Sequence, residues 1–291
     1  MLYVLKGHDL MKKIGIIGGG TMGNDIAQVY AVKGYDVVLR ARSEEANTRY
    51  AAKLNKSLAR LVEKGKMAQE DMDAALAHIT FTLELNDVAD CDLVIEALVE
   101  DFEIKKDYFQ KLDAICKPEA IFATNTSSIS ITMLAATVSR RDKFIGMHFF
   151  NPVPVMKLIE IIRGMETSDE TFAAIKDMSI DIGKEPVEVN DGPGFIVNKI
   201  LVPMINEAVC VLADGIASAE DIDKAMKLGA NHPMGPLALS DLIGNDTVLN
   251  IMQILYDETG DPKYRPNMLL KKMVRGGLLG KKTGKGFFVY G

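Results

Sequence analysis

The spacing of hydrophobic positions predicts an α/β fold for the first two thirds of the chain. Short apolar runs of strand length recur between amphipathic segments of helix length. The predicted strands are 13–18, 36–40, 78–82, 91–97, 120–124, 143–149, 155–162 and 186–189, and the predicted helices are 21–33, 44–64, 69–77, 101–115 and 169–183. Strands that alternate with helices indicate a mostly parallel sheet.

The pattern changes after Asp191–Gly194. Helical periodicity then covers 195–214, 218–228, 240–259 and 267–275, and a strand pattern returns only at 287–290. We therefore predict an α/β domain over residues 11–190 and an all-helical C-terminal domain over 191–291. Residues 1–10 precede Met11, which opens a lysine-flanked strand, and we expect them to form an extension outside the fold.

Composition and charge narrow the class of protein. The net charge of −6 argues against general nucleic-acid binding. No apolar run is long enough to span a membrane, and the N-terminus does not resemble a signal peptide. The three scattered cysteines form no CxxC pair, so we expect no metal site and a reducing compartment such as the cytoplasm.

The glycine-rich segment Gly18-Gly-Gly-Thr21-Met22-Gly23 lies between the first strand and the first helix. In this position Gly18 permits a tight turn, Gly20 lets the backbone approach a pyrophosphate, and Gly23 allows close packing of helix and strand. The helix start supplies N–H donors for phosphate groups. The segment therefore predicts a Rossmann-type site for a dinucleotide.

The end of the second strand bears on which nicotinamide cofactor is bound. NAD enzymes place an acidic residue here to bind the adenosine ribose, but this chain has Arg40-Ala41-Arg42. Without a carboxylate at Ala41, nothing repels a 2′-phosphate, and the two arginines are suited to bind one. Alternatively, both arginines are solvated and Glu44 or Glu45 reaches the ribose. The sequence leaves NAD and NADP open.

His148 and Glu160 are the strongest candidates for acid–base chemistry. His148 ends one apolar run, and Glu160 is the one carboxylate among the apolar residues on a face of the next run. A buried carboxylate is costly without a partner, and a histidine oriented by a carboxylate is a common general acid or base. A purely structural histidine is the alternative.

Two further polar groups are candidates for ligand contacts. Asn125-Thr-Ser-Ser128 follows a buried strand, where ligands of open α/β sheets bind, although Ser127 or Ser128 could instead cap the next helix. Asn198 is the one polar member of an apolar helical stripe. Its amide requires a hydrogen-bonding partner, from a ligand or from a neighbouring helix.

A basic strip runs along the helix predicted at 44–64. Its members recur at helical spacing and are Lys53, Lys56, Ser57, Arg60 and Lys64. The strip is suited to a multiply phosphorylated ligand such as the 3′-phospho-ADP of coenzyme A. An ordinary solvated face is the alternative.

These features together resemble the (S)-3-hydroxyacyl-CoA dehydrogenases, most closely the stand-alone bacterial members that act on 3-hydroxybutyryl-CoA. The resemblance covers Met11 to Tyr290 and rests on six ordered motifs, at Gly18–Gly23, Asp92–Ala97, Ala123–Ser128, Gly146–Pro152, Pro193–Asn198 and Met226–Pro236. The chain departs from the family at two places. Ala41 stands where the family usually has an acidic residue, and Asn24-Asp25 stands where it usually has small residues.

The resemblance implies roles for individual residues. His148 would be the general base, with Glu160 orienting it, and Ser127 and Asn198 would hydrogen-bond the reacting oxygen. Contacts to the nicotinamide half of the cofactor would come from Glu100, Lys105 and Asn125. Contacts to coenzyme A would come from Ser57 and Lys64, and Lys53 and Lys56 are suited to the same role.

The resemblance further implies a homodimer through the helical domain. It also implies reversible NAD(P)H-dependent reduction of acetoacetyl-CoA to (S)-3-hydroxybutyryl-CoA, in butyrate or short-chain fatty acid metabolism. One alternative is a dehydrogenase of a free hydroxy acid, which would not need the basic strip. Another is a protein that has kept the fold and binds a cofactor without turnover.

Overall fold

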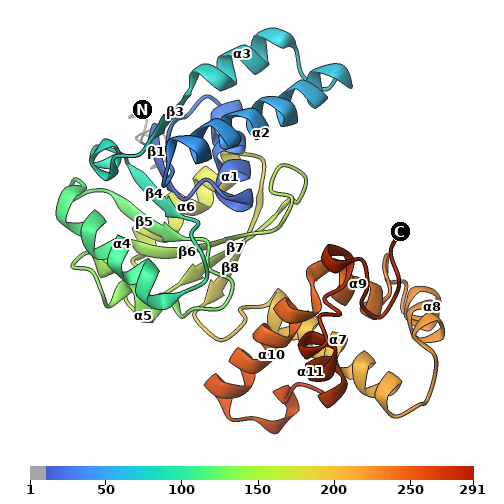
Figure 1. Cartoon of the computed structure of the whole chain (residues 1–291). Helices are drawn as coiled ribbons and strands as arrows, with labels where there is room; N and C mark the ends of the chain where they lie inside the picture. The colour runs from blue at the N-terminus through green and yellow to red at the C-terminus, as the bar shows by residue number, and fades with distance from the viewer. Residues whose placement is uncertain (1–10) are drawn as a thin grey trace, which may run out of the picture. The chain divides into compact units, whose positions relative to one another are not determined.

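The computed structural model describes residues 11–291, and the predicted extension at residues 1–10 lies outside them. The chain divides into two compact units, one ending at Asp191 and the other running from Gly192 to Gly291. The first unit contains a sheet covered by helices, and the second is built from helices (Figure 1).

An eight-stranded sheet forms the centre of the first unit, in the order β3-β2-β1-β4-β5-β6-β7-β8. Neighbouring strands are parallel except β6 and β7, which are antiparallel. The bounds are β1 Lys13–Ile17, β2 Asp36–Arg40, β3 Ile79–Thr82, β4 Leu93–Glu96, β5 Ile121–Thr124, β6 Phe144–Phe149, β7 Leu158–Arg163 and β8 Glu185–Asn190. This order confirms the predicted mostly parallel Rossmann-type sheet, with its switch point between β1 and β4.

Helices cover both faces of this sheet (Figure 1). They are α1 Thr21–Val32, α2 Glu44–Glu63, α3 Gln69–Ala77, α4 Phe102–Ile115, α5 Ile131–Ala135 and α6 Asp169–Asp181, with short 3-10 turns η2 Leu85–Val88 and η3 Arg141–Lys143. On one face α1 and α6 bury residues such as Tyr30 and Met178. In α4, Phe109 contacts Phe122 and Phe144, with ring centroids 5.9 and 4.7 Å apart. Burial of both faces explains why the strands are continuous apolar runs.

The second unit packs five helices around its own core. They are α7 Val197–Ala213, α8 Ala219–Gly229, α9 Pro236–Ile243, α10 Asn245–Thr259 and α11 Met268–Arg275, with 3-10 turns η4 Pro262–Tyr264 and η5 Lys281–Thr283. Ile205, Leu237, Met252 and Leu255 are fully buried in this core. Within residues 11–291, no helix combines the length and the apolar character needed to cross a membrane.

Two elements predicted in this unit, one helix and one strand, were wrong. The helix predicted over 240–259 is two helices, because Gly244 between α9 and α10 has a φ of 105°, which breaks the helical path. The strand predicted at 287–290 is reduced to an isolated bridge between Lys285 and Val289. The backbone N–H groups of Phe287 and Phe288 donate to the Asp241 carboxylate instead of to a neighbouring strand.

The start of the strand predicted at 155–162 was also wrong. β7 begins at Leu158, because the chain turns between β6 and β7. The Lys184 ammonium stabilises this turn by donating to the carbonyls of Val153 and Met156, at 2.8 Å for Met156. This turn carries the chain from His148 to Glu160, so its shape determines how the two strands align.

Candidate functional site

The glycine loop follows β1 and leads directly into α1. Gly18 has a φ of +98°, a conformation that residues with a Cβ rarely adopt. A Cβ at Gly23 would lie 1.8 Å from the Gly18 carbonyl oxygen, so the first turn of α1 can approach the loop only with glycine there. A Cβ at Gly20 would meet no atom within 4 Å, and Gly20 therefore faces open space.

The start of α1 is left open for an anion. Gly20 is the N-cap, no side chain caps the helix, and its first turn contains no acidic residue. The carboxylate of Asp25, one turn further on, lies 3.4 Å from the Lys53 ammonium on α2. Asp25 therefore reaches toward α2, and the N–H groups at the helix start remain suited to a pyrophosphate.

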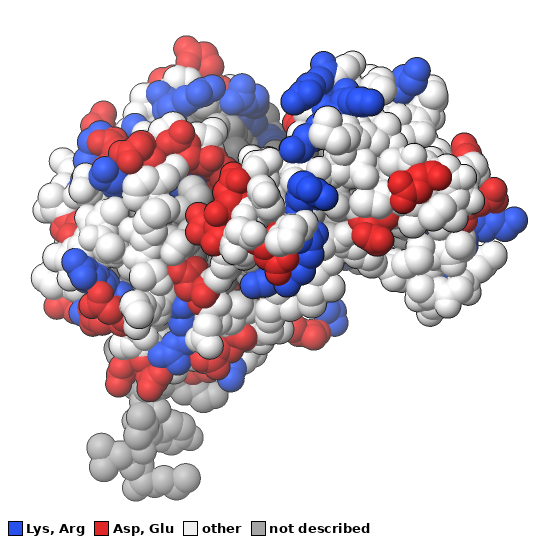
Figure 2. Space-filling view, turned by 90° about the horizontal axis from the view of Figure 1, so that it is seen from below, with Lys and Arg blue, Asp and Glu red and all other residues white. Residues whose placement is uncertain are grey.

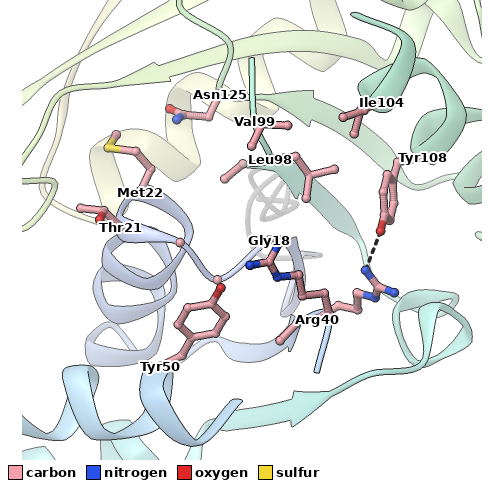
Figure 3. Close-up of a pocket in the computed structure, with 15 residues that line it drawn as sticks. Gly18, Thr21, Met22, Arg40, Tyr50, Leu98, Val99, Ile104, Tyr108 and Asn125 are labelled. Atoms are coloured by element: carbon pink, nitrogen blue, oxygen red, sulfur yellow. Dashed lines mark hydrogen bonds between the residues drawn. The ribbon is translucent and has the colours of Figure 1, made fainter. Parts of the chain in front are cut away.

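A cavity of about 530 Å³ lies beside this loop at the switch point of the sheet. In Figure 3, Asn125 and Met22 lie on one side of the view and Tyr108 on the other, with Gly18 between them. The lining residues come from the ends of β1, β2, β4 and β5 and from α1, α2 and α4, and they are Gly18, Gly19, Gly20, Thr21, Met22, Arg40, Ala41, Arg42, Tyr50, Ala97, Leu98, Val99, Ile104, Tyr108 and Asn125. A glycine loop and an uncapped helix start beside a cavity suit a dinucleotide.

At the β2 end of this cavity the two arginines differ. The Arg40 guanidinium donates to the Tyr108 hydroxyl at 2.7 Å and to the Leu83 carbonyl at 3.1 Å (Figure 3). Arg42 is exposed and forms no hydrogen bond or ion pair with any other residue in the described part of the chain. Ala41 is 2% exposed. Of the two arginines, Arg42 is therefore the one available to a phosphate.

His148 and Glu160 lie directly opposite each other on the antiparallel strands β6 and β7. The His148 Nδ1 is 2.7 Å from the Glu160 Oε2, and the two side chains are 8% and 1% exposed. This register explains the pairing, because directly opposed residues of an antiparallel ladder point to the same face. The geometry fixes the imidazole orientation and favours a proton on Nδ1, which leaves proton transfer to Nε2.

Asn125 connects the cavity to the strand that carries His148. Its Oδ1 accepts a hydrogen bond from the Phe149 N–H at 3.0 Å, and its side chain lines the cavity. Because β5 and β6 are parallel neighbours, their carboxyl ends meet at one edge of the sheet. Asn125 therefore links the cavity wall to the strand that carries His148, and a single site over both stays a prediction.

The loop after β5 is held by the Glu100 carboxylate. Glu100 Oε1 accepts from the N–H groups of Ser127 at 2.8 Å and Ser128 at 3.0 Å, and from the Thr126 hydroxyl at 2.6 Å. Burial raises the pKa of Glu100, but the Lys105 ammonium and these hydrogen bonds outweigh it and hold the pKa below its usual value. Ser130, rather than Ser127 or Ser128, caps α5, so the capping alternative was wrong for those two serines.

Lys105 is enclosed between two carboxylates. Its side chain is 1% exposed, and its ammonium lies 2.6 Å from Glu96 Oε1 and 3.4 Å from Glu100 Oε2. Direct contacts from Glu100 and Lys105 to a cofactor stay predictions. Glu96 was missed by the sequence analysis, although it is a carboxylate in an apolar strand, the same signal that singled out Glu160.

The basic strip lies on α2, which ends at Glu63 with Lys64 as its C-cap. Lys56, Arg60 and Lys64 are exposed and form no ion pair with another residue of the described range, whereas Lys53 pairs with Asp25. Ser57 is half-buried beside them. On the face shown in Figure 2, basic and acidic side chains are interspersed.

Asn198 lies in the first turn of α7, in the second unit, and is half-buried. The buried amide of that helix is Asn206, whose Oδ1 accepts from the Asn267 N–H at 2.9 Å. The role predicted for Asn198 at a reacting oxygen stays a prediction. Within residues 11–291, no cluster of three or more His, Cys, Asp or Glu side chains could hold a metal ion.

Comparison with known proteins gives the same division of the chain. Residues 13–192 match the family described as 3-hydroxyacyl-CoA dehydrogenase, NAD binding domain. Residues 194–290 match the family described as 3-hydroxyacyl-CoA dehydrogenase, C-terminal domain. The two matches together cover almost all described residues.

Three relatives illustrate the similarity. The chain is 55% identical to a 3-hydroxybutyryl-CoA dehydrogenase of Clostridioides difficile, over 96% of this chain and 99% of that one. It is 52% identical to a probable 3-hydroxybutyryl-CoA dehydrogenase of Deinococcus radiodurans, over 96% and 100%. The crystal structure of an (S)-3-hydroxybutyryl-CoA dehydrogenase from Ralstonia eutropha, 53% identical, superposes with a TM-score of 0.95 over 97% of this chain and 99% of that one.

Proposed function

The chain belongs to the 3-hydroxyacyl-CoA dehydrogenase family, and we propose that it reduces acetoacetyl-CoA reversibly to (S)-3-hydroxybutyryl-CoA with a nicotinamide cofactor. The observation that carries the proposal is the His148–Glu160 pair at 2.7 Å, on the strand that Asn125 ties to the cofactor cavity. The choice of a four-carbon acyl group rests on the activities named for the relatives.

In the proposed reaction, His148 handles the proton on the substrate oxygen. When bound in the cavity lined by the glycine loop and Asn125, a nicotinamide cofactor would supply or take up the hydride at C3. During reduction the C3 oxygen gains negative charge, and His148 donates a proton to it from Nε2; during oxidation Nε2 takes the hydroxyl proton. Glu160 keeps the ring in this tautomer and stabilises the imidazolium when it forms.

Ser127 and Asn198 are the proposed donors to the developing alkoxide. For Ser127 the support is its rigid setting. Glu100 accepts from its backbone N–H at 2.8 Å, which holds the residue in place. The Ser127 hydroxyl also donates to Glu100, at 3.3 Å, so it would have to turn from Glu100 to the alkoxide during the reaction. For Asn198 the support is the family resemblance alone.

Both NAD and NADP remain compatible with the cavity, and we propose that Ala41 and Arg42 decide between them. Ala41 places no carboxylate at the end of β2, and Arg42 is exposed at the cavity without a partner in the described residues. A guanidinium there would bind the 2′-phosphate of NADP.

Replacing Ala41 with Asp is expected to shift cofactor preference toward NAD by about ten-fold, because the new carboxylate binds the ribose hydroxyls and repels a 2′-phosphate. The measurement is the ratio of kcat/KM for NADH and NADPH. Arg42→Gln serves as the companion variant and should weaken NADPH alone. An unchanged ratio in Ala41→Asp would show that this position does not decide cofactor choice.

For the coenzyme A moiety we propose the α2 strip, where Lys56, Arg60 and Lys64 present unpaired charge around the half-buried Ser57. Lys53 joins them only if its ion pair with Asp25 opens, because that pair spans 3.4 Å in the present structure. Three neighbouring cations suit the phosphates of 3′-phospho-ADP.

Reversing two charges of this strip, in Lys56→Glu with Arg60→Glu, is expected to raise the KM for acetoacetyl-CoA by about ten-fold through lost phosphate attraction. The KM for acetoacetyl-pantetheine, which lacks 3′-phospho-ADP, should not change. Lys176→Glu on α6 is the control for a charge reversal away from the strip. Equal changes for both thioesters, or no change for either, would remove the strip from the binding site.

The proposed metabolic setting and compartment rest on the proposed substrate and on the cysteines. Short-chain fatty acid or butyrate metabolism follows from the proposed substrate. A reducing compartment, such as the cytoplasm, is consistent with Cys91, Cys116 and Cys210, which are all free thiols. Dimerisation through the helical unit stays a prediction of the family resemblance.

A further inference from the structure

Two carboxylates share a single ammonium in the interior of the first unit. Glu96, the last residue of β4, is 0% exposed, and its Oε1 lies 2.6 Å from the Lys105 Nζ. Glu100 Oε2 lies 3.4 Å from the same nitrogen. With both carboxylates ionised, this Glu96–Lys105–Glu100 cluster carries one negative charge in excess.

The two carboxylates are surrounded mainly by donors, as ionised carboxylates are. Glu96 accepts from the Leu98 N–H and, at 2.7 Å, from the Thr124 hydroxyl, as well as from Lys105. Glu100 accepts from backbone N–H groups and forms an ion pair with Lys105, and its pKa is held below its usual value. Backbone N–H groups and ammonium groups donate and cannot accept, so these contacts favour the ionised form of each carboxylate.

This cluster lies directly behind one wall of the cofactor cavity. Leu98, whose N–H binds Glu96, lines the cavity, and so does Asn125, whose backbone N–H donates to the Glu96 carbonyl at 2.8 Å. The glycine loop and Arg42 lie at the other end, where pyrophosphate and adenosine ribose would bind. The wall beside Asn125 and the His148 strand is therefore where a nicotinamide ring would lie.

The nicotinamide ring is cationic when oxidised and neutral when reduced. A fixed negative charge near the ring attracts the first form and not the second, and a buried charge is poorly screened by salt. We propose that Glu96 gives the site an excess negative charge that strengthens binding of the oxidised cofactor relative to the reduced one. This inference rests on the proposed function, because it needs a nicotinamide in the cavity.

The test is Glu96→Gln, which removes one charge and keeps acceptor atoms for Lys105 and Leu98. For unit charges on the order of 10 Å apart and an effective dielectric constant of about 20, the dissociation constant of the oxidised cofactor should rise roughly 15-fold relative to that of the reduced one. Reduced cofactor is titrated by its intrinsic fluorescence and oxidised cofactor by calorimetry.

Matched variants separate charge from structure. Glu103→Gln removes an exposed carboxylate from α4 and should leave the ratio of the two constants unchanged. Glu96→Asp keeps the charge and should also keep the ratio, even if both forms bind less well. If a melting scan shows that Glu96→Gln is unfolded, Glu100→Gln removes the same excess charge and takes its place.

The outcomes are distinguishable. A shifted ratio in Glu96→Gln but not in Glu103→Gln supports the inference. Equal losses for both cofactor forms, or no loss, overturn it and leave the cluster a structural element. If wild-type protein binds neither cofactor form, the proposed function fails instead.

Discussion

Replacing His148 with Gln is expected to lower kcat at least ~10²-fold, because a positioned acid or base contributes about that factor. Gln keeps a polar side chain of similar size, so the fold and the cofactor affinity should persist. Steady-state kinetics with acetoacetyl-CoA measures the effect, and a cofactor titration shows whether the cavity remains intact.

Glu160→Gln should have a similar effect on turnover, since an amide cannot stabilise the imidazolium and can orient the ring in the wrong tautomer. His78→Gln is the matched control. His78 lies just before β3, its ring 2.8 Å from the Asp36 carboxylate, so it also forms a histidine–carboxylate pair, but a half-exposed one. Near-wild-type turnover in both His148→Gln and Glu160→Gln would remove the pair from the mechanism.

Replacing Gly20 with Ala is expected to raise the cofactor dissociation constant at least ~10-fold, because a methyl group there occupies the space that the pyrophosphate must approach. The added Cβ would meet no protein atom within 4 Å, so thermal stability should not fall. The binding loss would then come from the cofactor site and not from unfolding.

Gly229→Ala in α8 provides the control for this variant. Its Cβ also meets no atom within 4 Å, and it belongs to the helical unit, whereas the glycine loop belongs to the first unit. Neither its melting temperature nor its cofactor affinity should decrease. An unchanged dissociation constant in Gly20→Ala would show that the pyrophosphate does not approach the loop at this position.

Local patterns were sufficient to predict most elements of the first unit. β2 and α3 have the predicted bounds, Asp36–Arg40 and Gln69–Ala77. Their ends are marked by residues within or beside each element, so the local sequence pattern was sufficient to place them. The same logic paired His148 with Glu160, since a carboxylate in an apolar strand requires a nearby partner. The ladder between β6 and β7 provides that pairing.

The errors arise where distant residues determine the local conformation. Asp241 binds the backbone N–H groups of Phe287 and Phe288 and so replaces the strand partner that an apolar alternating segment would need. Lys184 similarly stabilises the turn that delays the start of β7. Neither interaction leaves a signal in the spacing of nearby residues.

The roles of polar residues in the site were only partly predictable. Asn198 was singled out as the polar member of an apolar stripe, but the buried amide of α7 is Asn206, which binds the backbone of the segment before α11. Glu96 could have been predicted as a candidate, because it is a carboxylate at the end of a fully buried strand. The Lys105 ammonium that pairs with Glu96 is on the next helix. Only the structure shows that Glu100 forms an ion pair with the same ammonium.

The most direct test of the account is an absorbance assay of wild-type protein with acetoacetyl-CoA, first with NADH and then with NADPH. We predict acetoacetyl-CoA-dependent oxidation of at least one of the two cofactors. Free acetoacetate should react at least ~10²-fold more slowly, because it lacks the binding energy of the coenzyme A portion. Oxidation of neither cofactor, or equal rates with free acetoacetate and the thioester, would contradict the proposed function.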